Sequence, residues 1–263
     1  MSKPLTAHPV PEDALSPSTA VDRAVSILEA LAATPDGLSN AELSRRFDIP
    51  KSSASYLLRA LEQRGYVRRE PSSGKYRLGL RVLALNRAVL AGLDIRELAR
   101  PLLRELMERT GLTAHLAVLE HGQAVYIEKV DAPGFIKMDT WVGRHMDVHC
   151  TSVGKALVAH LPKAEVEAIL REHGLRKRSP KTITSPGRFF HELEKVRAQG
   201  YAVDDEENNP GARCVGAPVF GLQGEVRAAV GVSGTTGQIP RANLAKVAEQ
   251  VREAAGRISA QLA

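Results

Sequence analysis

The sequence predicts an α+β chain with a small helical domain first and a larger mixed domain after it. Between residues 21 and 64, apolar residues recur at spacings of three and four, which is typical of helices. Two short alternating stretches then flank a Pro-Ser-Ser-Gly turn at 71–74, which indicates a hairpin. After residue 110, strand-like and helix-like segments are mixed, which favours a sandwich with a largely antiparallel central sheet.

Composition narrows the class of protein. The chain has 263 residues, 43% hydrophobic and 25% charged, so a wholly disordered protein is excluded. No apolar run approaches the roughly 20 residues of a membrane helix, and the first residues lack the pattern of a secretory signal. Two cysteines, Cys150 and Cys214, are too few for a disulfide framework. We therefore expect a cytoplasmic protein.

The positive charge is concentrated in one segment. Residues 39–81 contain ten Lys and Arg against four acids, and this excess equals the net charge of +6 of the whole chain. A surface that only keeps a protein in solution spreads its charge, whereas a nucleic-acid-binding surface concentrates it. The segment therefore predicts a polyanionic partner.

The N-terminal pattern begins with a tail and two helices. Residues 1–20 predict a flexible tail, because four prolines and few apolar residues occur at the start. A helix begins at Val21 and ends at the Pro-Asp-Gly turn at 35–37. Ser39 stands three residues before Glu42, which is the capping-box spacing for the start of a second, short helix.

A third helix and a basic hairpin follow. The third helix begins at Lys51 with a small, polar first turn and ends before Gly65, and the hairpin covers residues 66–78. Three helices followed by a basic hairpin form a winged helix-turn-helix, which we assign to residues 21–79. The alternative is a generic three-helix bundle with a charged, solvated face, and the charge concentration argues against it.

Such a domain predicts which side chains meet DNA. The first turn of the third helix reaches base edges in the major groove, and the hairpin meets phosphates. We therefore expect double-stranded DNA to be bound by Ser39, Lys51, Ser52, Ser53, Ser55, Tyr56, Arg59, Arg68, Arg69, Lys75 and Arg77.

Residues 80–110 predict a linker helix, interrupted at Gly92 and Pro101. The segment is more apolar than a small domain needs, which indicates packing against a second copy or another domain. A helix buried only within its own chain is the alternative. We expect the contact between copies at Leu83, Val89 and Leu90, with Val25 and Leu28 of the first helix partly available.

Residues 111–263 predict the mixed domain. Alternating patterns indicate strands at 116–119, 125–130, 135–140, 201–204, 214–220 and 227–233. Helices are expected to begin near Thr151, Pro162, Pro186 and Pro240.

Common enzyme signatures fail in this chain. The stretch at 153–156 is not a phosphate loop, because His149 stands where its first glycine belongs and Ala156 where Mg²⁺ needs Ser or Thr. The stretch at 231–235 lacks the last glycine of a nucleophile elbow, and the nearby glycines lack dinucleotide-binding spacing. We expect no catalytic residue and no cofactor.

One short segment carries possible metal ligands. His145, Asp147, His149 and Cys150 lie within six residues and could close around a divalent ion with Cys214. The spacing is not that of a strong zinc site, so we favour ordinary loop and pocket residues and assign no metal. A Cys-His nucleophilic pair from the same atoms is a further alternative, but no orienting partner is visible.

The following helix start suggests a ligand site. Thr151 or Ser152 would cap this helix, and free N–H groups at a helix start attract a carboxylate. A capped helix without a ligand is equally common, so the observation needs support from elsewhere.

Such support comes from a resemblance. The stretch at 200–207, followed after six residues by 214–220, resembles the signature of the IclR family of bacterial transcriptional regulators in the spacing of Gly200, Asp204, Glu207 and Cys214. Gly221 departs from the Asp or Asn that ends this signature, which puts only the next turn in doubt.

Other segments are similar to the same family. These are the stretches at 22–24, 51–53, 149–156 and 229–233, so the resemblance extends from Val21 to about Ala260. It implies a winged helix for operator binding, a linker helix and a GAF-like effector-binding domain, in homodimers or dimers of dimers. It also implies small organic acids as effectors.

By this resemblance the effector pocket involves Asp204, Cys214 and Ser233, backbone N–H groups near Gly154 and small residues near Ala212. Together with the helix start, the expected effector site is Thr151, Ser152, Gly154, Asp204, Ala212, Cys214 and Ser233. An ionised Asp204 would repel a second carboxylate, which favours hydroxy- or oxo-monoacids.

The expected function is a ligand-responsive, sequence-specific DNA-binding transcriptional regulator controlled by a small organic acid. The alternative is a small-molecule enzyme that uses Cys214 or Cys150 and carries an attached DNA-binding module.

Overall fold

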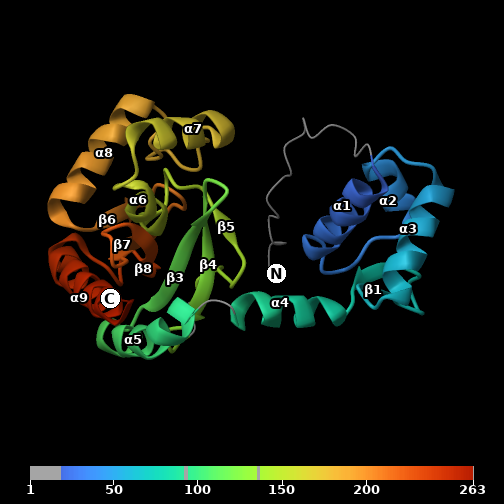
Figure 1. The fold of residues 1–263 in the computed structure, drawn as a ribbon, viewed down its shortest axis with the longest axis horizontal. Coiled ribbons are helices and arrows are strands. Elements are labelled where there is room, and N and C mark those ends of the chain that lie inside the picture. The colour runs from blue at the N-terminus through green and yellow to red at the C-terminus, as the bar shows by residue number, and fades with distance from the viewer. Residues whose placement is uncertain (1–18, 92–93, 135–136, 263) are drawn as a thin grey trace. The chain divides into compact units, whose positions relative to one another are not determined.

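The computed structural model describes residues 19–91, 94–134 and 137–262, and only the backbone of Leu90 and Ala91. The chain divides between Gly92 and Leu93 into two units, and each is described by itself (Figure 1). Residues 1–18 of the predicted tail lie outside the described part. No described helix has the length and apolarity needed to cross a membrane.

The N-terminal unit has the predicted order of elements. They are α1 (Ala20–Ala32), α2 (Asn40–Arg46), α3 (Lys51–Gln63), β1 (Val67–Arg69), β2 (Tyr76–Leu78) and α4 (Arg81–Ala91). The Ser39–Glu42 capping box begins α2 as expected. Gly65 follows α3 with φ of +74°, a conformation that ends the helix and turns the chain into the hairpin. The winged helix-turn-helix prediction is confirmed.

The core of this unit joins all three helices to the hairpin. Ile27 of α1, Leu43 of α2, Leu58 of α3 and Val67 of β1 are buried in one apolar cluster. Their burial leaves the polar side of α3 and the outer side of the hairpin to solvent.

The segment expected as one linker helix consists of two helices with different roles. α4 carries exposed apolar side chains, whereas α5 (Asp94–Thr110) buries Leu102, Leu103 and Leu106 in the core of the C-terminal unit. That unit therefore begins at Leu93 and not at residue 111, because the apolar face of α5 covers its sheet. Pro101 lies within α5 and does not end it.

The C-terminal unit is built on a six-stranded antiparallel sheet, as predicted. Its strands are β3 (Thr113–Glu120), β4 (Gln123–Val130), β5 (His145–Met146), β6 (Ala202–Asp205), β7 (Ala212–Phe220) and β8 (Val226–Thr235). They are arranged in the order β5-β4-β3-β8-β7-β6, so sequence-distant strands β3 and β8 are paired at the centre.

One predicted strand is wrong. Residues 137–140 form no strand, and 135–136 lie outside the described part. The backbone carbonyls of Met138 and Thr140 accept hydrogen bonds from Lys129 Nζ at 3.1 and 2.7 Å. These carbonyls are thus bonded to a side chain instead of a neighbouring strand. On the side of β4 that faces away from β3, the paired strand is the short β5.

Helices cover both faces of the sheet (Figure 1). On one face, α5 and α9 (Leu244–Leu262, after a short 3-10 turn at Arg241–Asn243) enclose the apolar strand residues. On the other face lie α6 (Ser152–Val158), α7 (Lys163–His173) and α8 (Pro186–Gln199). Alternation along each strand therefore determines which helices a side chain meets.

Two glycines let the start of α6 lie directly on the sheet. A Cβ at Gly216 of β7 would stand 2.8 Å from the carbonyl carbon of Ser152, and one at Gly231 of β8 would stand 2.7 Å from Val153 Cγ1. Larger residues would force the helix away from the strands. The close approach brings the start of α6 beside β7 and β8, two positions along these strands from Cys214 and Ser233.

Candidate functional site

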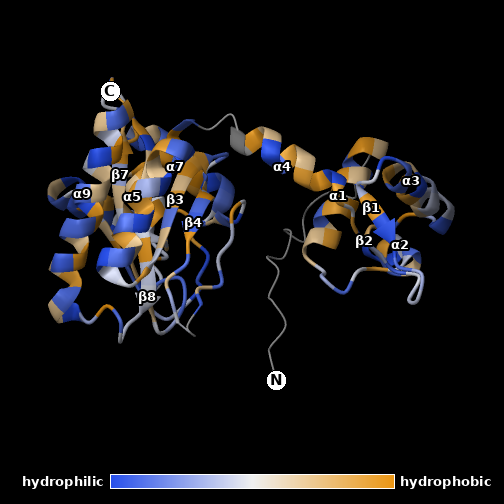
Figure 2. Ribbon diagram, turned by 90° about the horizontal axis from the view of Figure 1, so that it is seen from below, coloured by the Kyte–Doolittle hydropathy of each residue, from blue (hydrophilic) through white to orange (hydrophobic). Residues whose placement is uncertain are grey.

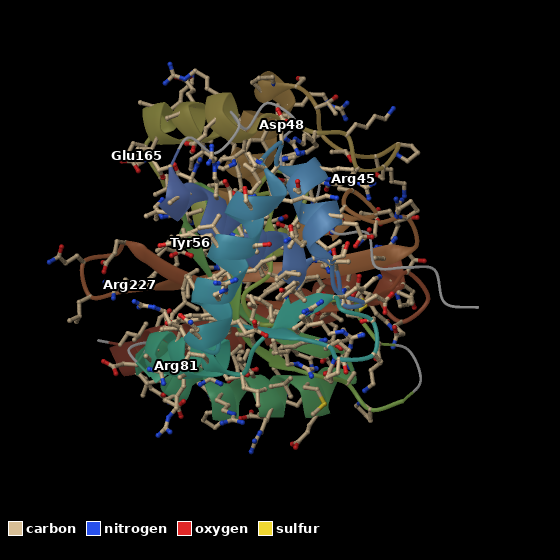
Figure 3. All side chains as sticks on the ribbon, turned by 90° about the vertical axis from the view of Figure 1, so that its right-hand side faces the viewer. Arg45, Asp48, Tyr56, Arg81, Glu165 and Arg227 are labelled. Carbon is tan, nitrogen blue, oxygen red and sulfur yellow. The ribbon has the colours of Figure 1, made fainter. Side chains whose placement is uncertain are left out.

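The first turn of α3 presents polar groups at the surface. Its N-cap residue is Pro50, which forms no side-chain cap, and the first turn contains no acid. Lys51, Ser52, Tyr56 and Arg59 are exposed, with Tyr56 73% accessible (Figure 3), whereas the predicted Ser53 is half-buried. A positively polarised helix start with small polar side chains suits the major groove of DNA.

Two predicted DNA-binding serines already have partners inside the unit. The Ser39 hydroxyl donates to Glu42 Oε2 at 2.7 Å within the capping box. The Ser55 hydroxyl accepts from Asn40 Nδ2 at 2.5 Å, and this bond joins α2 to α3. The Ser39 hydroxyl therefore caps α2, and the Ser55 hydroxyl holds α3 against it.

The hairpin gathers the remaining predicted cations. Arg68 and Arg77 stand directly opposite each other in the β1–β2 register. Arg69 lies 5.9 Å from the Tyr76 ring, and Lys75 sits at the turn. Like charges directly opposite on paired strands repel; Glu70 Oε2 lies 3.6 Å from Arg68 Nη1, and a phosphate beside the pair would lower the repulsion further.

In the C-terminal unit, four strands align a row of polar residues. Asp204 pairs with Cys214, Cys214 with Ser233, and Ser233 with Thr113. The register thus brings together three residues that the sequence predicted from two distant segments. Ala212 is half-buried two positions before Cys214, and its N–H donates to Asn209 O at 3.2 Å.

Asp204 is the acidic residue of this row, and 2% of its surface is exposed. Its Oδ1 accepts from the N–H groups of Glu207 at 2.7 Å and Asn208 at 3.3 Å. Burial nevertheless raises the pKa of Asp204 to about 7. This shift opposes the full ionisation of Asp204 that we assumed from the sequence.

The start of α6 differs from the sequence expectation. Thr151 caps it as predicted, with Oγ1 accepting from Gly154 N at 3.3 Å and donating to Asp147 O at 2.8 Å. The Gly154 N–H is therefore not free for a ligand, because the helix satisfies it locally. Thr151 and Ser152 are both buried.

A buried lysine missed by the sequence analysis links α6 to the polar row. Lys155 is completely buried, and its Nζ donates to Val203 O at 2.8 Å, to Glu207 Oε1 at 2.5 Å and to Glu192 Oε1 at 3.4 Å. These bonds connect α6 with β6, with the turn after it and with α8. A lone lysine inside the apolar run 153–158 was the available signal.

A second missed pair lies on the same face of the sheet. The rings of His115 on β3 and Tyr126 on β4 have centroids 4.6 Å apart, and His115 Nε2 lies 2.8 Å from Thr140 Oγ1. Burial lowers the pKa of His115 to about 3, so the imidazole is neutral. Polar residues at alternate positions of otherwise apolar strands were the signal for both.

Three of the possible metal ligands do gather. The donor atoms of Asp147, His149 and Cys150 lie within 4.8 Å of one another, whereas His145 is exposed on β5. Asp147 Oδ2, however, accepts from Arg178 at 2.9 and 2.5 Å. A metal would have to compete with this guanidinium, so the arrangement is a structural ion pair more than a metal site.

Neither thiol is activated. Burial raises the pKa values of Cys150 and Cys214, and nearby carboxylates raise them further. A nucleophilic cysteine needs the opposite change. Cys150 Sγ instead lies 3.8 Å from Asn208 Oδ1, which connects it to the loop that holds Asp204.

A surface cavity of about 380 Å³ lies elsewhere in this unit, at the end of α6 and between α7 and α8. His160, Phe190 and Arg197 are among its lining residues. Arg197 Nη1 donates to Ala159 O at 2.7 Å, so this guanidinium supports the end of α6. None of the predicted site residues lines the cavity.

A winged helix-turn-helix followed by a two-faced antiparallel sheet defines the class of DNA-binding regulators with a separate C-terminal domain. The family model described as "IclR helix-turn-helix domain" matches residues 20–71. The family model described as "Bacterial transcriptional regulator IclR C-terminal" matches residues 87–260. The chain belongs to the IclR family of DNA-binding transcriptional regulators.

Named relatives agree with this assignment. The HTH-type transcriptional regulator XynR of Escherichia coli (strain K12) is 36% identical over 242 residues, which are 92% of this chain and 96% of XynR. The regulator BhcR of Paracoccus denitrificans (strain Pd 1222) is 35% identical over 91% of this chain and 86% of its own.

Solved structures share the fold. The crystal structure of the Thermotoga maritima IclR has a TM-score of 0.76 at 33% identity and covers 92% of this chain and 98% of its own. That of an IclR transcriptional regulator from Alicyclobacillus acidocaldarius has a TM-score of 0.80 at 27% identity, covering 93% and 98%.

Lys155→Met should destabilise the C-terminal unit by about 3–5 kcal/mol, because Glu207 and Glu192 would lose their buried counter-charge. Urea unfolding followed by circular dichroism measures the change. Lys163→Met, at a side chain 74% exposed on α7, is the matched control and should change stability by less than about 0.5 kcal/mol. Equal unfolding midpoints for the two variants would contradict the role of Lys155.

Proposed function

We propose that this regulator binds double-stranded operator DNA through α3 and the hairpin, and that a small organic acid bound at the polar row of the C-terminal unit controls it. The observation that carries the proposal is the alignment of buried Asp204 and Ser233 with half-buried Cys214 beside the start of α6. Buried polar groups of this kind are costly for a domain unless they serve structure or a ligand.

Direct readout is proposed for α3 and phosphate binding for the hairpin. Ser52, Tyr56 and Arg59 are exposed on α3, which supports contacts with base edges. The opposed Arg68 and Arg77 support contacts with phosphates.

Arg59→Ala should relax sequence preference, because it removes a base-edge contact. Lys75→Ala should weaken binding to all sequences and reduce the slope of log affinity against log salt by about one unit. Titrations of fluorescent operator DNA, selected from a random pool, measure both effects at several salt concentrations. Lys246→Ala on α9 is the control for loss of one exposed charge. Unchanged operator affinity in both test variants would refute the groove assignment.

The chemistry of the row supports a monoacid effector. The hydroxyls of Ser152 and Ser233 are donors for a carboxylate, and Asp204 can exchange a hydrogen bond with an effector hydroxyl. An ionised Asp204 would repel the anion in this buried place, so binding should favour the protonated acid. Asp204 takes up that proton readily because burial raises its pKa to about 7.

The affinity for an acid effector should therefore fall as pH rises above about 7, by up to about tenfold per pH unit, because binding then requires proton uptake. Calorimetry between pH 6 and 8, with an acid found by thermal-shift screening, measures this dependence. Asp204→Asn cannot ionise and should bind with little pH dependence.

Asp205→Asn is the control for that experiment, because Asp205 pairs with Arg213 and Arg241 instead of the row. It should keep the wild-type pH dependence. An identical pH profile for Asp204→Asn and wild type would remove Asp204 from the effector site.

A homodimer is proposed from the exposed apolar surface of the N-terminal unit. Figure 2 shows that α4 and α1 carry hydrophobic residues along their length. Leu83 and Val89 of α4 are 61% and 66% exposed, and Val25 of α1 is 48% exposed. Leu28 is half-buried in its own core, and the side chain of Leu90 lies outside the described part. Two copies would present two recognition helices about 34 Å apart to an imperfect palindrome.

Substituting Leu83 and Val89 together by Glu should give a smaller species that binds a half-site and a full palindrome equally weakly, because charges cannot be buried between chains. Sedimentation and operator titration provide the measurements. Leu222→Glu, at a leucine 76% exposed in the β7–β8 turn, is the control. A wild-type chain that sediments as a monomer with and without DNA would refute the dimer.

The regulator is favoured over an enzyme that uses Cys214 or Cys150. The raised pKa values of both thiols oppose nucleophilic catalysis. The curated relatives described above are named as transcriptional regulators.

A further inference from the structure

We propose that Tyr126 is a specificity-determining residue of the effector site, and that its hydroxyl binds a hydroxyl or oxo oxygen of the effector. The preferred ligand is then a hydroxylated or oxo monoacid instead of an apolar acid. This inference rests on the proposed effector site and assigns a recognition role to a strand, β4, that contributes none of the residues predicted from the sequence.

The first observation is the position of the side chain. Tyr126 is 6% exposed and lies on the face of the sheet that carries the polar row. Burial raises the pKa of Tyr126, and the nearby Cys214, Asp204 and Cys150 raise it further. The ring also packs in the same apolar cluster as Val153, which lies at the start of α6.

The second observation is the lack of a hydrogen-bond partner. The backbone of Tyr126 is bonded, with its N–H donating to Arg144 O at 3.1 Å and its carbonyl accepting from Gly143 N at 2.7 Å. Within the described residues, however, nothing hydrogen-bonds to its hydroxyl. Among the described residues, the enclosed polar atoms that lack a partner do not include this hydroxyl, so it reaches accessible space where a ligand can meet it. An effector oxygen would supply the missing partner.

The third observation is that the ring is held in place. It packs against the neutral His115, which is itself fixed by Thr140. Lys129 Nζ holds the Thr140 carbonyl from the same side at 2.7 Å. A phenol fixed in this way is preorganised to recognise one position of a ligand.

Charge then selects the ligand group at that position. Asp204 and Glu207 bring acidic groups to this side of the site, and Lys155 is already engaged by Glu207. Because Lys155 is engaged, its ammonium is not free to hold a carboxylate beside Tyr126, whereas a hydroxyl can accept from Tyr126 and exchange a hydrogen bond with protonated Asp204. The effector carboxylate is therefore expected at the serine hydroxyls.

The test uses the full chain and two matched pairs of acids, lactate with propionate and gluconate with hexanoate. Calorimetry should show that the wild type prefers the hydroxylated member of at least one pair. Tyr126→Phe should reduce affinity for that member by about tenfold or more and leave its deoxy analogue within about twofold. Tyr201→Phe makes the same chemical change at a tyrosine packed against the opposite core and should alter neither affinity.

Stability separates ligand recognition from packing. Without ligand, Tyr126→Phe should unfold at the same temperature as wild type, because it removes a hydroxyl that bonds to no described residue. A lower unfolding temperature would show an internal partner and overturn the proposal. Equal losses for both members of a pair, or no loss for either, would do the same.

Operator binding distinguishes failure of the Tyr126 proposal from failure of the proposed function. If no acid of the panel binds wild type while it still binds operator DNA, the hydroxy-acid class and the role of Tyr126 are overturned and the DNA-binding function stands. If wild type binds neither, the proposed function itself fails.

Discussion

The buried ammonium of Lys155 is the interaction on which the C-terminal site depends. A charge with no exposed surface is tolerable only when several partners surround it, and the partners here come from β6, from the turn after it and from α8. The same turn supplies the N–H groups that hold Asp204. One ion-pair network therefore fixes α6 and Asp204 relative to each other.

The sheet makes this network useful because its two faces differ. Residues such as Val215 and Val232 point to α5 and α9, whereas their neighbours Cys214 and Ser233 point to the other side. Side-chain alternation alone thus separates a structural core from a polar site on the same strands. The small residue Gly216 completes the arrangement by letting α6 approach the strands at backbone distance.

Both units carry charged or polar side chains that a bound partner would stabilise. In the N-terminal unit, Arg68 and Arg77 face each other across the hairpin, and polyanionic DNA neutralises such a pair. In the C-terminal unit, Tyr126 has no hydrogen-bond partner within the described residues, and a small polar ligand would supply one. In both units, groups that can take a further partner thus lie where we propose that partner to bind.

The sequence by itself determined the order of helices and hairpin and the concentration of charge. Through its resemblance to the family, it also predicted Asp204, Cys214 and Ser233 as effector-site residues. These features depend on local periodicity and composition, which a linear pattern records. Only the tertiary structure decided that α5 belongs to the C-terminal core, that the Gly154 N–H is occupied, that burial raises the pKa of Asp204 and that Tyr126 packs on the α6 face of the sheet. Burial and cross-strand neighbours cause these properties, and both arise from contacts between residues far apart in the chain.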